Sequence, residues 1–291
     1  MYNKNKGKIF VIVWIASYPK SGNTWVRAII SSVLFSDDGR LDDFSLLDNI
    51  DQYPTKKYFE TLIKNYNNPV EIQENWIPSQ RLINYDKKIR FFKTHHIFCK
   101  YGINAFTDNL NTMGVIHVVR DPRDLVSSIK NHWSLQNNHE AMVKLFDEQN
   151  ATGLKINKNH DYSFPVIISS WKNHYIAWSK IKKNYLLIKY EDLVNDPEKQ
   201  LKIILKYLKK FFRFKIDDNK IKNILETTTF EHFEKLEEKK LFKESNLDQS
   251  GRLKKFFNNN PNKINQKKLN NEIRKQIEDE FNSELKELEY I

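Results

Sequence analysis

The stretch "WIASYPKSGNTW", residues 14–25, passes from apolar residues through a short polar turn into a helical pattern. The run "IFVIVWIA", residues 9–16, is apolar and rich in β-branched residues, which is typical of a buried strand. In "WVRAIISSVLF", residues 25–35, apolar side chains recur at helical spacing. A strand, a Ser-Gly-Asn-Thr turn and a helix bring backbone N–H groups and the positive end of the helix macrodipole together. The stretch therefore predicts an anion-binding loop.

The side chains of this loop suit an anion. Gly22 lets the backbone approach a ligand closely. Ser21, Asn23 and Thr24 add hydrogen-bond donors, and Lys20 adds a full positive charge just ahead of the turn.

The loop differs from the phosphate loop of nucleotidases, whose frame is G-x-x-x-x-G-K-[ST]. That frame places Ser17 at the first glycine and Asn23 at the lysine, and a lysine stands instead at position 20. A small-molecule kinase that uses ATP and Mg²⁺ is an alternative, but Asn23 at the lysine position argues against it. We therefore expect an anion other than a triphosphate.

The rest of the chain predicts an α/β fold with a central parallel β-sheet flanked by α-helices, in one domain over residues 1–291. Residues 36–88 and 134–168 have weaker periodicity and are expected to form helices and loops that line a pocket. The expected strands are residues 9–16, 89–94, 115–119 and 185–190. Because ligands bind beyond the carboxyl ends of such strands, the residues that follow them are the candidates for chemistry.

Several helices have clear start signals. Asp121 with Pro122, and Asp196 with Pro197, each combine a capping side chain with a proline at the first helical position. A last helix is expected over about 265–290, packed on the domain, from apolar residues spaced by four.

Composition limits the classes of protein. With 29% charged and 40% hydrophobic residues the chain is expected to be globular, and residues 9–16 are too few to span a bilayer. That run also lacks a small-residue cleavage site, so we expect a cytoplasmic protein. A net charge of +11 would suit a polyanionic partner. The lysines are scattered along the chain rather than gathered in one stripe, so no nucleic-acid partner is expected. A basic nucleic-acid-binding protein is the second alternative.

Cysteine usage and ligand spacing bear on metals. Cys99 is the single cysteine of the chain, which excludes an internal disulfide and a cysteine cluster. Its neighbours offer no pairing for a nucleophile, and we expect it to be inert. The chain contains no metal-ligand spacing, so we expect no metal.

The motif "YPKSGNTW", residues 18–25, resembles the 5′-phosphosulfate loop of the sulfotransferases that use 3′-phosphoadenosine 5′-phosphosulfate (PAPS). The usual form in that family is Y-P-K-S-G-T-T-W. The resemblance implies that Lys20 acts at the leaving phosphate and that the turn from Ser21 to Thr24 holds the 5′-phosphate. It also implies that Trp25 lies on one side of the adenine.

A second stretch, "HVVRDPRDLVSSIKNHW" at residues 117–133, is similar to the family's 3′-phosphate signature. The resemblance gives this role to Arg120 and Ser128. An arginine at a strand end and a hydroxyl two turns into the following helix are suitably spaced to close on one phosphate.

A third stretch, "FFKTHH" at residues 91–96, resembles the family's K-T-H element. The match implies that His95 is the catalytic base, with Lys93 beside it. A neutral histidine is suited to take a proton from a hydroxyl at cellular pH. His96 is the rival, and because neighbours on an extended strand point to opposite faces, only one of the two is expected to reach the pocket.

Shorter matches extend the resemblance. "IKYEDL" places Tyr190 against the adenine, and "TTTF" at residues 227–230 places Thr228 near the nucleotide. The family's R-K-G-x-x-G-x-W-K-x-x-F element is only half present in "SGRLKKFF" at residues 250–257, with "NLD" in place of R-K-G. The second cation at the 3′-phosphate is therefore open among Arg252, Lys254 and Lys243.

The resemblance implies a P-loop-like sheet and transfer of a sulfuryl group from PAPS, as co-substrate, to a hydroxyl or, less favourably, an amine. Such a reaction requires no metal. The acceptor is expected to be a small molecule, a lipid or a carbohydrate, and the residues leave open which. They predict nothing about oligomers.

Overall fold

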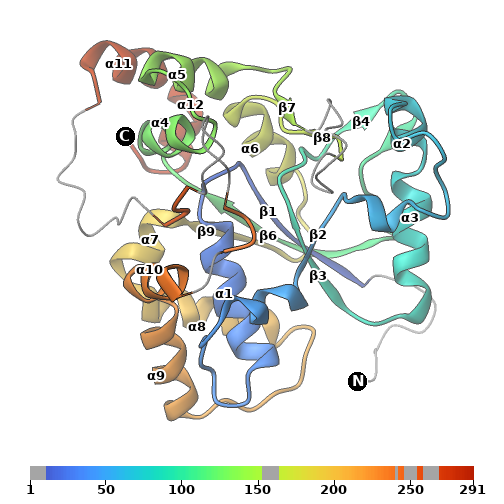
Figure 1. Cartoon of the computed structure of the whole chain (residues 1–291), viewed down its shortest axis with the longest axis vertical. Coiled ribbons are helices and arrows are strands. Elements are labelled where there is room, and N and C mark those ends of the chain that lie inside the picture. Colours follow the sequence, from blue (N-terminus) through green and yellow to red (C-terminus); the bar gives the residue numbers. More distant parts are fainter. Residues whose placement is uncertain (1–10, 153–163, 240–241, 246–253, 258–268) are drawn as a thin grey trace. The chain divides into compact units, whose positions relative to one another are not determined.

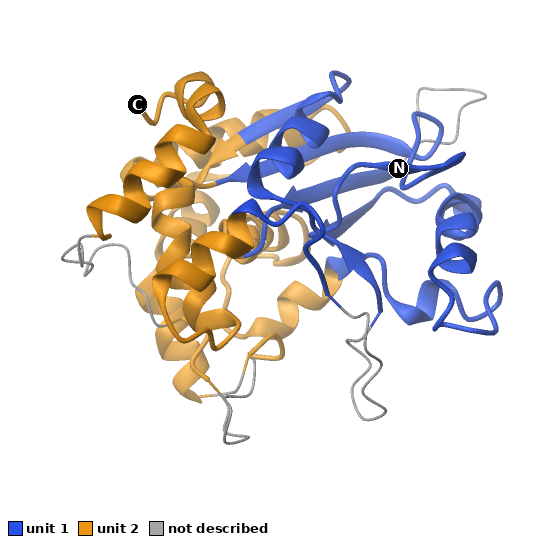
Figure 2. Ribbon diagram, turned by 90° about the horizontal axis from the view of Figure 1, so that it is seen from above, with its two compact units in different colours: residues 1–19, 50–119, 146–187 blue, residues 20–49, 120–145, 188–291 orange. Residues whose placement is uncertain are grey.

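The structure is a computed structural model of the chain (Figure 1). It describes residues 11–152, 164–239, 242–245, 254–257 and 269–291. The chain forms two compact units, coloured separately in Figure 2. Unit 1 contains residues 1–19, 50–119 and 146–187, and unit 2 contains residues 20–49, 120–145 and 188–291. The expectation of one domain over the whole chain stays a prediction.

A five-stranded sheet has the strand order β2-β3-β1-β6-β9 (Figure 1). Strand β1 pairs in parallel with β3 and with β6, and β2 pairs in parallel with β3. The strands are β1 (Ile12–Ser17), β2 (Asp51–Gln52), β3 (Arg90–Thr94), β6 (Thr112–Val119) and β9 (Tyr185–Lys189). The four strands expected from the sequence are therefore present with shifted ends, and residues 9–10 lie outside the described residues.

Trp14 of β1 is the centre of the core of unit 1. It is fully buried, and its indole N–H donates to Thr112 Oγ1 at 2.9 Å. The rings of Tyr53 and Phe106 lie 5.4 and 5.5 Å from it, between centroids. Large aromatic rings bury more apolar area than any other side chains, so this cluster fixes β1 between its neighbours.

Short elements complete unit 1. Two small antiparallel pairs, β4 with β5 and β7 with β8, are not indicated by the sequence pattern. The further elements are η2 (Lys56–Tyr58), α2 (Pro69–Glu74), α3 (Trp76–Ile83), η3 (Asn84–Asp86), β4 (Lys100–Tyr101), β5 (Asn104–Ala105), β7 (Ala151–Thr152), β8 (Val166–Ile167) and α6 (Trp171–Ser179).

Unit 2 is helical. A second aromatic cluster forms its core, in which Phe44 and Phe257 stack with centroids 5.6 Å apart and planes at 12°. Its elements are α1 (Asn23–Phe35), η1 (Phe44–Asn49), α4 (Pro122–His132), α5 (Asn138–Phe146), α7 (Tyr190–Asn195), α8 (Pro197–Leu208), α9 (Asp218–Thr227), α10 (Phe230–Lys239), α11 (Asn271–Glu280) and α12 (Asn282–Glu287).

The predicted helix starts are confirmed. Asp121 accepts from the backbone N–H of Arg123 at the start of α4, and Pro122 is the first helical residue. Asp196 accepts from the backbone N–H of Lys199 in the same way, ahead of α8.

The prediction of one continuous helix over 265–290 is wrong. Helix α11 ends at Glu280 and α12 begins at Asn282, because Phe281 leaves the helical region with φ −109° and ψ 22°. Phe281 is itself buried, so the apolar face continues through the break. A pattern of side chains cannot register such a change in the backbone angles of one residue. Residues 265–268 lie outside the described residues.

The cap of α8 gives a test of local stability. Asp196 is exposed and acts through its cap. Asp196→Ala should lower the free energy of unfolding by about 1 kcal/mol in urea titrations, because the first turn loses an acceptor. Asp196→Asn keeps the acceptor and should stay close to wild type. Equal stability of the alanine and asparagine variants would contradict the assignment.

Candidate nucleotide-binding and acid–base site

The predicted anion-binding loop enters α1 through two left-handed residues. Lys20 has φ 68° and Gly22 has φ 100°. Gly22 is the N-cap of α1, and its carbonyl accepts from the N–H groups of Trp25 and Val26 at 3.0 and 3.2 Å. Because a glycine cap has no side chain, it offers no acceptor to the N–H groups of the first turn. The helix start therefore has the arrangement that favours an anion.

The ring of Tyr190 packs directly on this glycine. A Cβ atom at Gly22 would lie 2.7 Å from Tyr190 Cδ2. The Cζ atom of Arg120 lies 4.1 Å from the centroid of the same ring, and the Trp25 ring meets it edge-on at 5.8 Å and 76°. Three predicted nucleotide-binding side chains thus meet around one residue of the loop. The two aromatic rings are in edge contact and do not form a parallel slot.

Two buried polar atoms of this cluster indicate a missing partner. Within the described part of the chain, neither Ser21 Oγ nor Arg120 Nε has a hydrogen-bond partner. Ser21 is fully buried and Arg120 is 7% exposed. Buried polar groups without partners are costly, so a bound anion would satisfy both. The guanidinium also donates to the carbonyl of Lys20 at 3.3 Å.

The remaining predicted residues of unit 2 have these positions. Ser128 is buried on α4, the helix that follows Arg120. Asn23 and Thr24 are buried in the first turn of α1. Thr228 is buried at the end of α9, where its hydroxyl donates to the carbonyl of Ile224.

The second cation of the 3′-phosphate clamp stays open. Arg252 and the "NLD" segment lie outside the described residues. Lys254 Nζ donates to Asn131 O, in the last turn of α4, and to Ser134 Oγ, just after that helix, at 2.6 and 2.7 Å. Lys243 forms a surface ion pair with Asp48.

Lys20 contacts an aromatic ring that the sequence did not point to. Its Nζ lies 3.5 Å from the centroid of Phe256. An ammonium over a ring face is attracted by the ring quadrupole. Phe256 packs against the aromatic core of unit 2, so its position in the sequence indicates a packing residue and not a contact of Lys20.

In unit 1, the candidate base follows β3 directly. His95 Nδ1 lies 2.8 Å from the carbonyl oxygen of Ser17, the last residue of the neighbouring strand β1. A carbonyl only accepts, so Nδ1 carries the proton and the lone pair of the neutral ring is at Nε2. Nε2 is the atom that a general base uses. The partner Ser17 was not predicted, because 78 residues separate it from His95.

His96 points into the core instead. It is fully buried, stacked on Phe106 with centroids 4.1 Å apart, and its Nδ1 donates to the carbonyl of Ile97 at 2.7 Å. Burial lowers the pKa of His96 to about 4, so it is neutral at cellular pH. Lys93 is also largely buried, on β3.

A buried histidine on α6 contacts the candidate base. His174 forms a hydrogen bond with the backbone of His95, and burial lowers its pKa well below the usual value. Its helix has Trp171, Tyr175 and Trp178 on the same buried face. From the sequence, this spacing predicts only that His174 lies on the buried face of a helix, and it does not predict the contact with His95.

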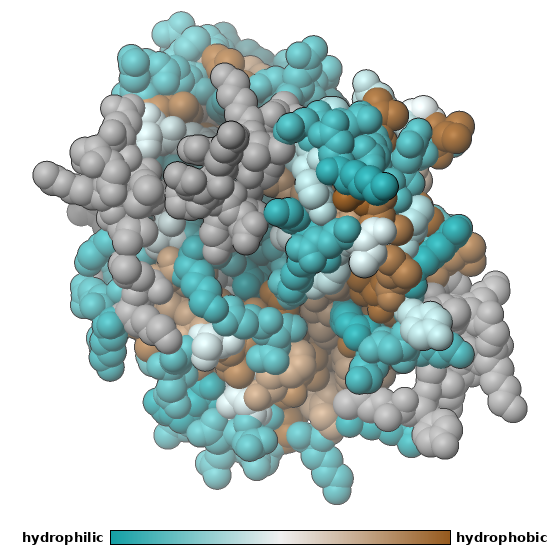
Figure 3. Space-filling model, turned by 45° about the vertical axis from the view of Figure 1, so that its right-hand side comes forward, coloured by the Kyte–Doolittle hydropathy of each residue, from teal (hydrophilic) through white to brown (hydrophobic). Residues whose placement is uncertain are grey.

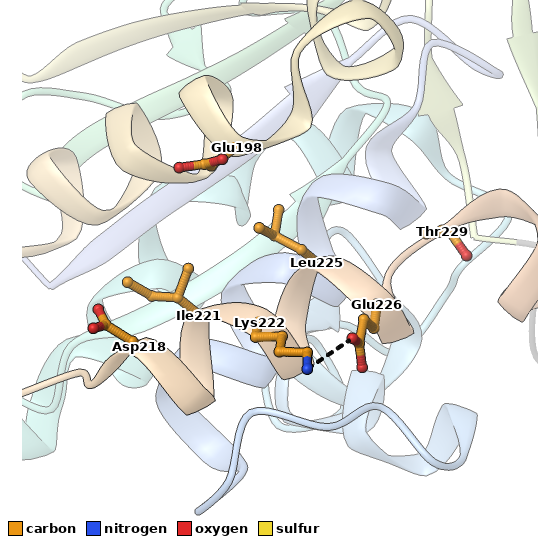
Figure 4. Close-up of a pocket in the computed structure, with 7 residues that line it drawn as sticks. All are labelled: Glu198, Asp218, Ile221, Lys222, Leu225, Glu226 and Thr229. Carbon is orange, nitrogen blue, oxygen red and sulfur yellow. Dashed lines mark ion pairs between the residues drawn. The ribbon is translucent and has the colours of Figure 1, made fainter.

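Two surface features contain none of the predicted site residues. Hydrophobic side chains lie among hydrophilic ones on the surface (Figure 3), and Tyr85 and Ile103 are 86% and 88% exposed. A groove of about 480 Å³ between α8 and α9 has Ile221 and Leu225 on its inner side and acidic residues at its rim (Figure 4). Lys222 in that groove pairs with Glu226 at 3.8 Å.

The described residues contain no group of three or more His, Cys, Asp or Glu side chains placed to hold a metal ion. Among the helices that the structure describes, none has the length and apolar character needed to cross a membrane.

The close contact at Gly22 gives a test with a matched control. Gly22→Ala should destabilise the protein more than Gly102→Ala, since both glycines have positive φ but a Cβ at Gly102 meets nothing within 4 Å. The left-handed backbone alone should cost about 1 kcal/mol, and the clash with Tyr190 about 1–3 kcal/mol more. Urea unfolding measures both variants, and equal losses would refute the contact.

Comparison with known proteins identifies relatives. Sulfotransferase 1B1 of Canis lupus familiaris is 26% identical over 224 residues, covering 75% of this chain and 64% of that protein. Luciferin sulfotransferase of Photinus pyralis is 27% identical over 225 residues, covering 75% of this chain and 55% of its own length. The chain thus spans less than two thirds of these curated relatives.

A solved structure shares the fold. Retinol dehydratase, crystallised in complex with androsterone and the inactive cofactor PAP, superposes with a TM-score of 0.53 at 20% sequence identity. The match covers 94% of this chain and 80% of that chain, which confirms the predicted α/β class. The family model described as "Sulfotransferase domain" matches residues 12–289. Because that match includes nearly all of the chain, the protein belongs to the sulfotransferase domain family.

Proposed function

We propose that the protein is a sulfotransferase that moves the sulfuryl group of PAPS to a hydroxyl, or less favourably an amine, of a small acceptor. The observation that carries this proposal is the packing of Arg120 and Tyr190 around the Gly22 turn, with buried polar atoms of Ser21 and Arg120 left for an anion. The family match and the sulfotransferase names of both curated relatives support it.

The nucleotide is assigned to residues of unit 2. Ser21, Gly22, Asn23 and Thr24 would hold the 5′-phosphate through N–H and hydroxyl donors at the start of α1. Arg120 and Ser128 would bind the 3′-phosphate, with Lys254 next to the same helix as a candidate second cation. Trp25 and Tyr190 would contact the adenine, and Thr228 would lie near the nucleotide. Arg252 remains a candidate.

The reaction requires charge neutralisation and removal of one proton. The acceptor oxygen attacks sulfur, the bond from sulfur to the bridging phosphate oxygen breaks, and 3′-phosphoadenosine 5′-phosphate (PAP) leaves with the electron pair. Lys20 is assigned to the negative charge that develops on this phosphate, and Lys93 is a second candidate for that task. His95 Nε2 would take the acceptor proton, because its Nδ1–H is held by the Ser17 carbonyl. No step in this scheme needs a metal.

The acceptor class is a proposal of its own. The retinol dehydratase structure that shares this fold is a complex with androsterone, which is a small molecule. We infer that small alcohols, phenols, lipids and carbohydrates are the acceptors to test, by transfer of labelled sulfate from PAPS to a panel of each.

Nucleotide binding is tested by thermal unfolding. At a PAP concentration about 100 times its Kd, the folded state should gain about 2.7 kcal/mol. Adenosine 5′-monophosphate at the same concentration should stabilise less, since Arg120 and Ser128 then lack a 3′-phosphate. If ATP with Mg²⁺ stabilised the protein and PAP did not, a kinase would be favoured. No shift with PAP would refute the proposal.

The base assignment is tested at two adjacent residues. His95→Ala should lower turnover by about 10²–10⁴-fold, the usual contribution of a general base, and leave the Kd of PAP close to wild type. His96→Ala should lower the melting temperature, because it empties a buried ring from the core. Retained turnover in His95→Ala together with a folded, inactive His96→Ala would reverse the assignment.

A further inference from the structure

Resting on the proposed function, we propose that Tyr290 is a positioning residue for the 3′-phosphate contact. Its hydroxyl donates to Glu191 Oε2 at 2.8 Å. Glu191 directly follows Tyr190 in the chain, and Tyr290 comes from the segment after α12. All of these residues belong to unit 2.

The carboxylate of Glu191, in the first turn of α7, also bonds to the N-cap residue of α4. Its second oxygen, Oε1, accepts from the backbone N–H of Asp121 at 3.0 Å, and Asp121 directly follows Arg120. Burial raises the pKa of Glu191, while the donors from Asp121 and Tyr290 stabilise its charged form. One carboxylate thus ties the residue after Arg120 to the residue after Tyr190, with Tyr290 as its other donor.

A second set of bonds fixes Tyr290 itself. Arg123 donates to the carbonyl oxygen of Tyr290 at 2.9 Å and to Glu278 of α11 at 2.5 Å. The same guanidinium pairs with the carboxylate of Asp121 at 2.6 Å. Lys189, the residue before Tyr190, donates to the carbonyl of Leu288 at 3.0 Å. The segment at residues 288–290 therefore accepts hydrogen bonds from two residues close in sequence to the assigned nucleotide residues. Lys189 directly precedes Tyr190, and Arg123 lies three positions after Arg120.

The consequence is specific to the 3′-phosphate. Arg120 is assigned to bind that group, and its Cζ lies 4.1 Å from the centroid of Tyr190. Removing the Tyr290 hydroxyl leaves Glu191 Oε2 without this donor and allows the carboxylate to turn away from the Asp121 N–H. The hydrogen bond between Asp121 and Glu191, the residues that directly follow Arg120 and Tyr190, is then weakened. Discrimination between PAP and adenosine 5′-monophosphate should fall.

The test compares Tyr290→Phe with two control variants by isothermal titration with PAP and with adenosine 5′-monophosphate. The Kd of PAP should rise about tenfold, because the residues assigned to the 3′-phosphate lose a hydrogen bond to the charged group that positions them, and the preference for PAP should shrink. Tyr101→Phe removes the hydroxyl of an exposed tyrosine and should change neither value. Ile204→Val, which removes a buried methylene from α8, should lower stability but leave the preference for PAP unchanged.

A double variant tests the route of the effect. Because Tyr290 acts through Glu191, Tyr290→Phe combined with Glu191→Ala should lose no more preference than Glu191→Ala alone. A Tyr290→Phe variant that loses stability but keeps the wild-type preference for PAP would overturn the inference while leaving the proposed function intact. A wild-type protein that does not bind PAP would overturn both.

Discussion

The contact between Gly22 and the ring of Tyr190 is the constraint on which the residues assigned to the nucleotide in unit 2 depend. A side chain at position 22 would collide with that ring, and the same ring contacts the guanidinium of Arg120. Gly22 of the turn, Tyr190 after β9 and Arg120 after β6 are therefore in contact with one another through the Tyr190 ring. The turn also begins α1, so an aromatic side chain distant in sequence packs against the helix start to which the anion is assigned.

The two adjacent histidines show how one strand end separates two tasks. His95 and His96 differ by a single position, yet one bonds to the end of β1 and the other is stacked within aromatic side chains. The Ser17 carbonyl selects the tautomer of His95, which no property of the histidine itself determines. Burial holds His96 neutral and makes it part of the packing. The chemistry assigned to His95 therefore depends on the register between β1 and β3.

The sequence predicted those features that depend on residues close together in the chain. The strand predicted at residues 9–16 and observed at residues 12–17, the capping residues Asp121 and Asp196 and the glycine turn all follow from short stretches of sequence. The partners of His95 and Glu191 did not, because they come from residues 78 and 99 positions away. The break at Phe281 was missed for a different reason, since the buried face continues across it. The periodicity of side chains predicts which face of a helix is buried, and it does not predict the backbone angles of one residue such as Phe281.

The left-handed conformation of Lys20 has a consequence for how this protein can change. A residue with a Cβ atom at φ 68° is strained by about 1–2 kcal/mol relative to glycine, so a glycine there would relax the loop. Selection for a more stable fold would remove the lysine, and selection for a cation at the proposed anion site would keep it. Position 20 is thus a place where folding and the assigned chemistry favour different residues. Stabilising the protein by sequence design would have to leave this strained residue untouched.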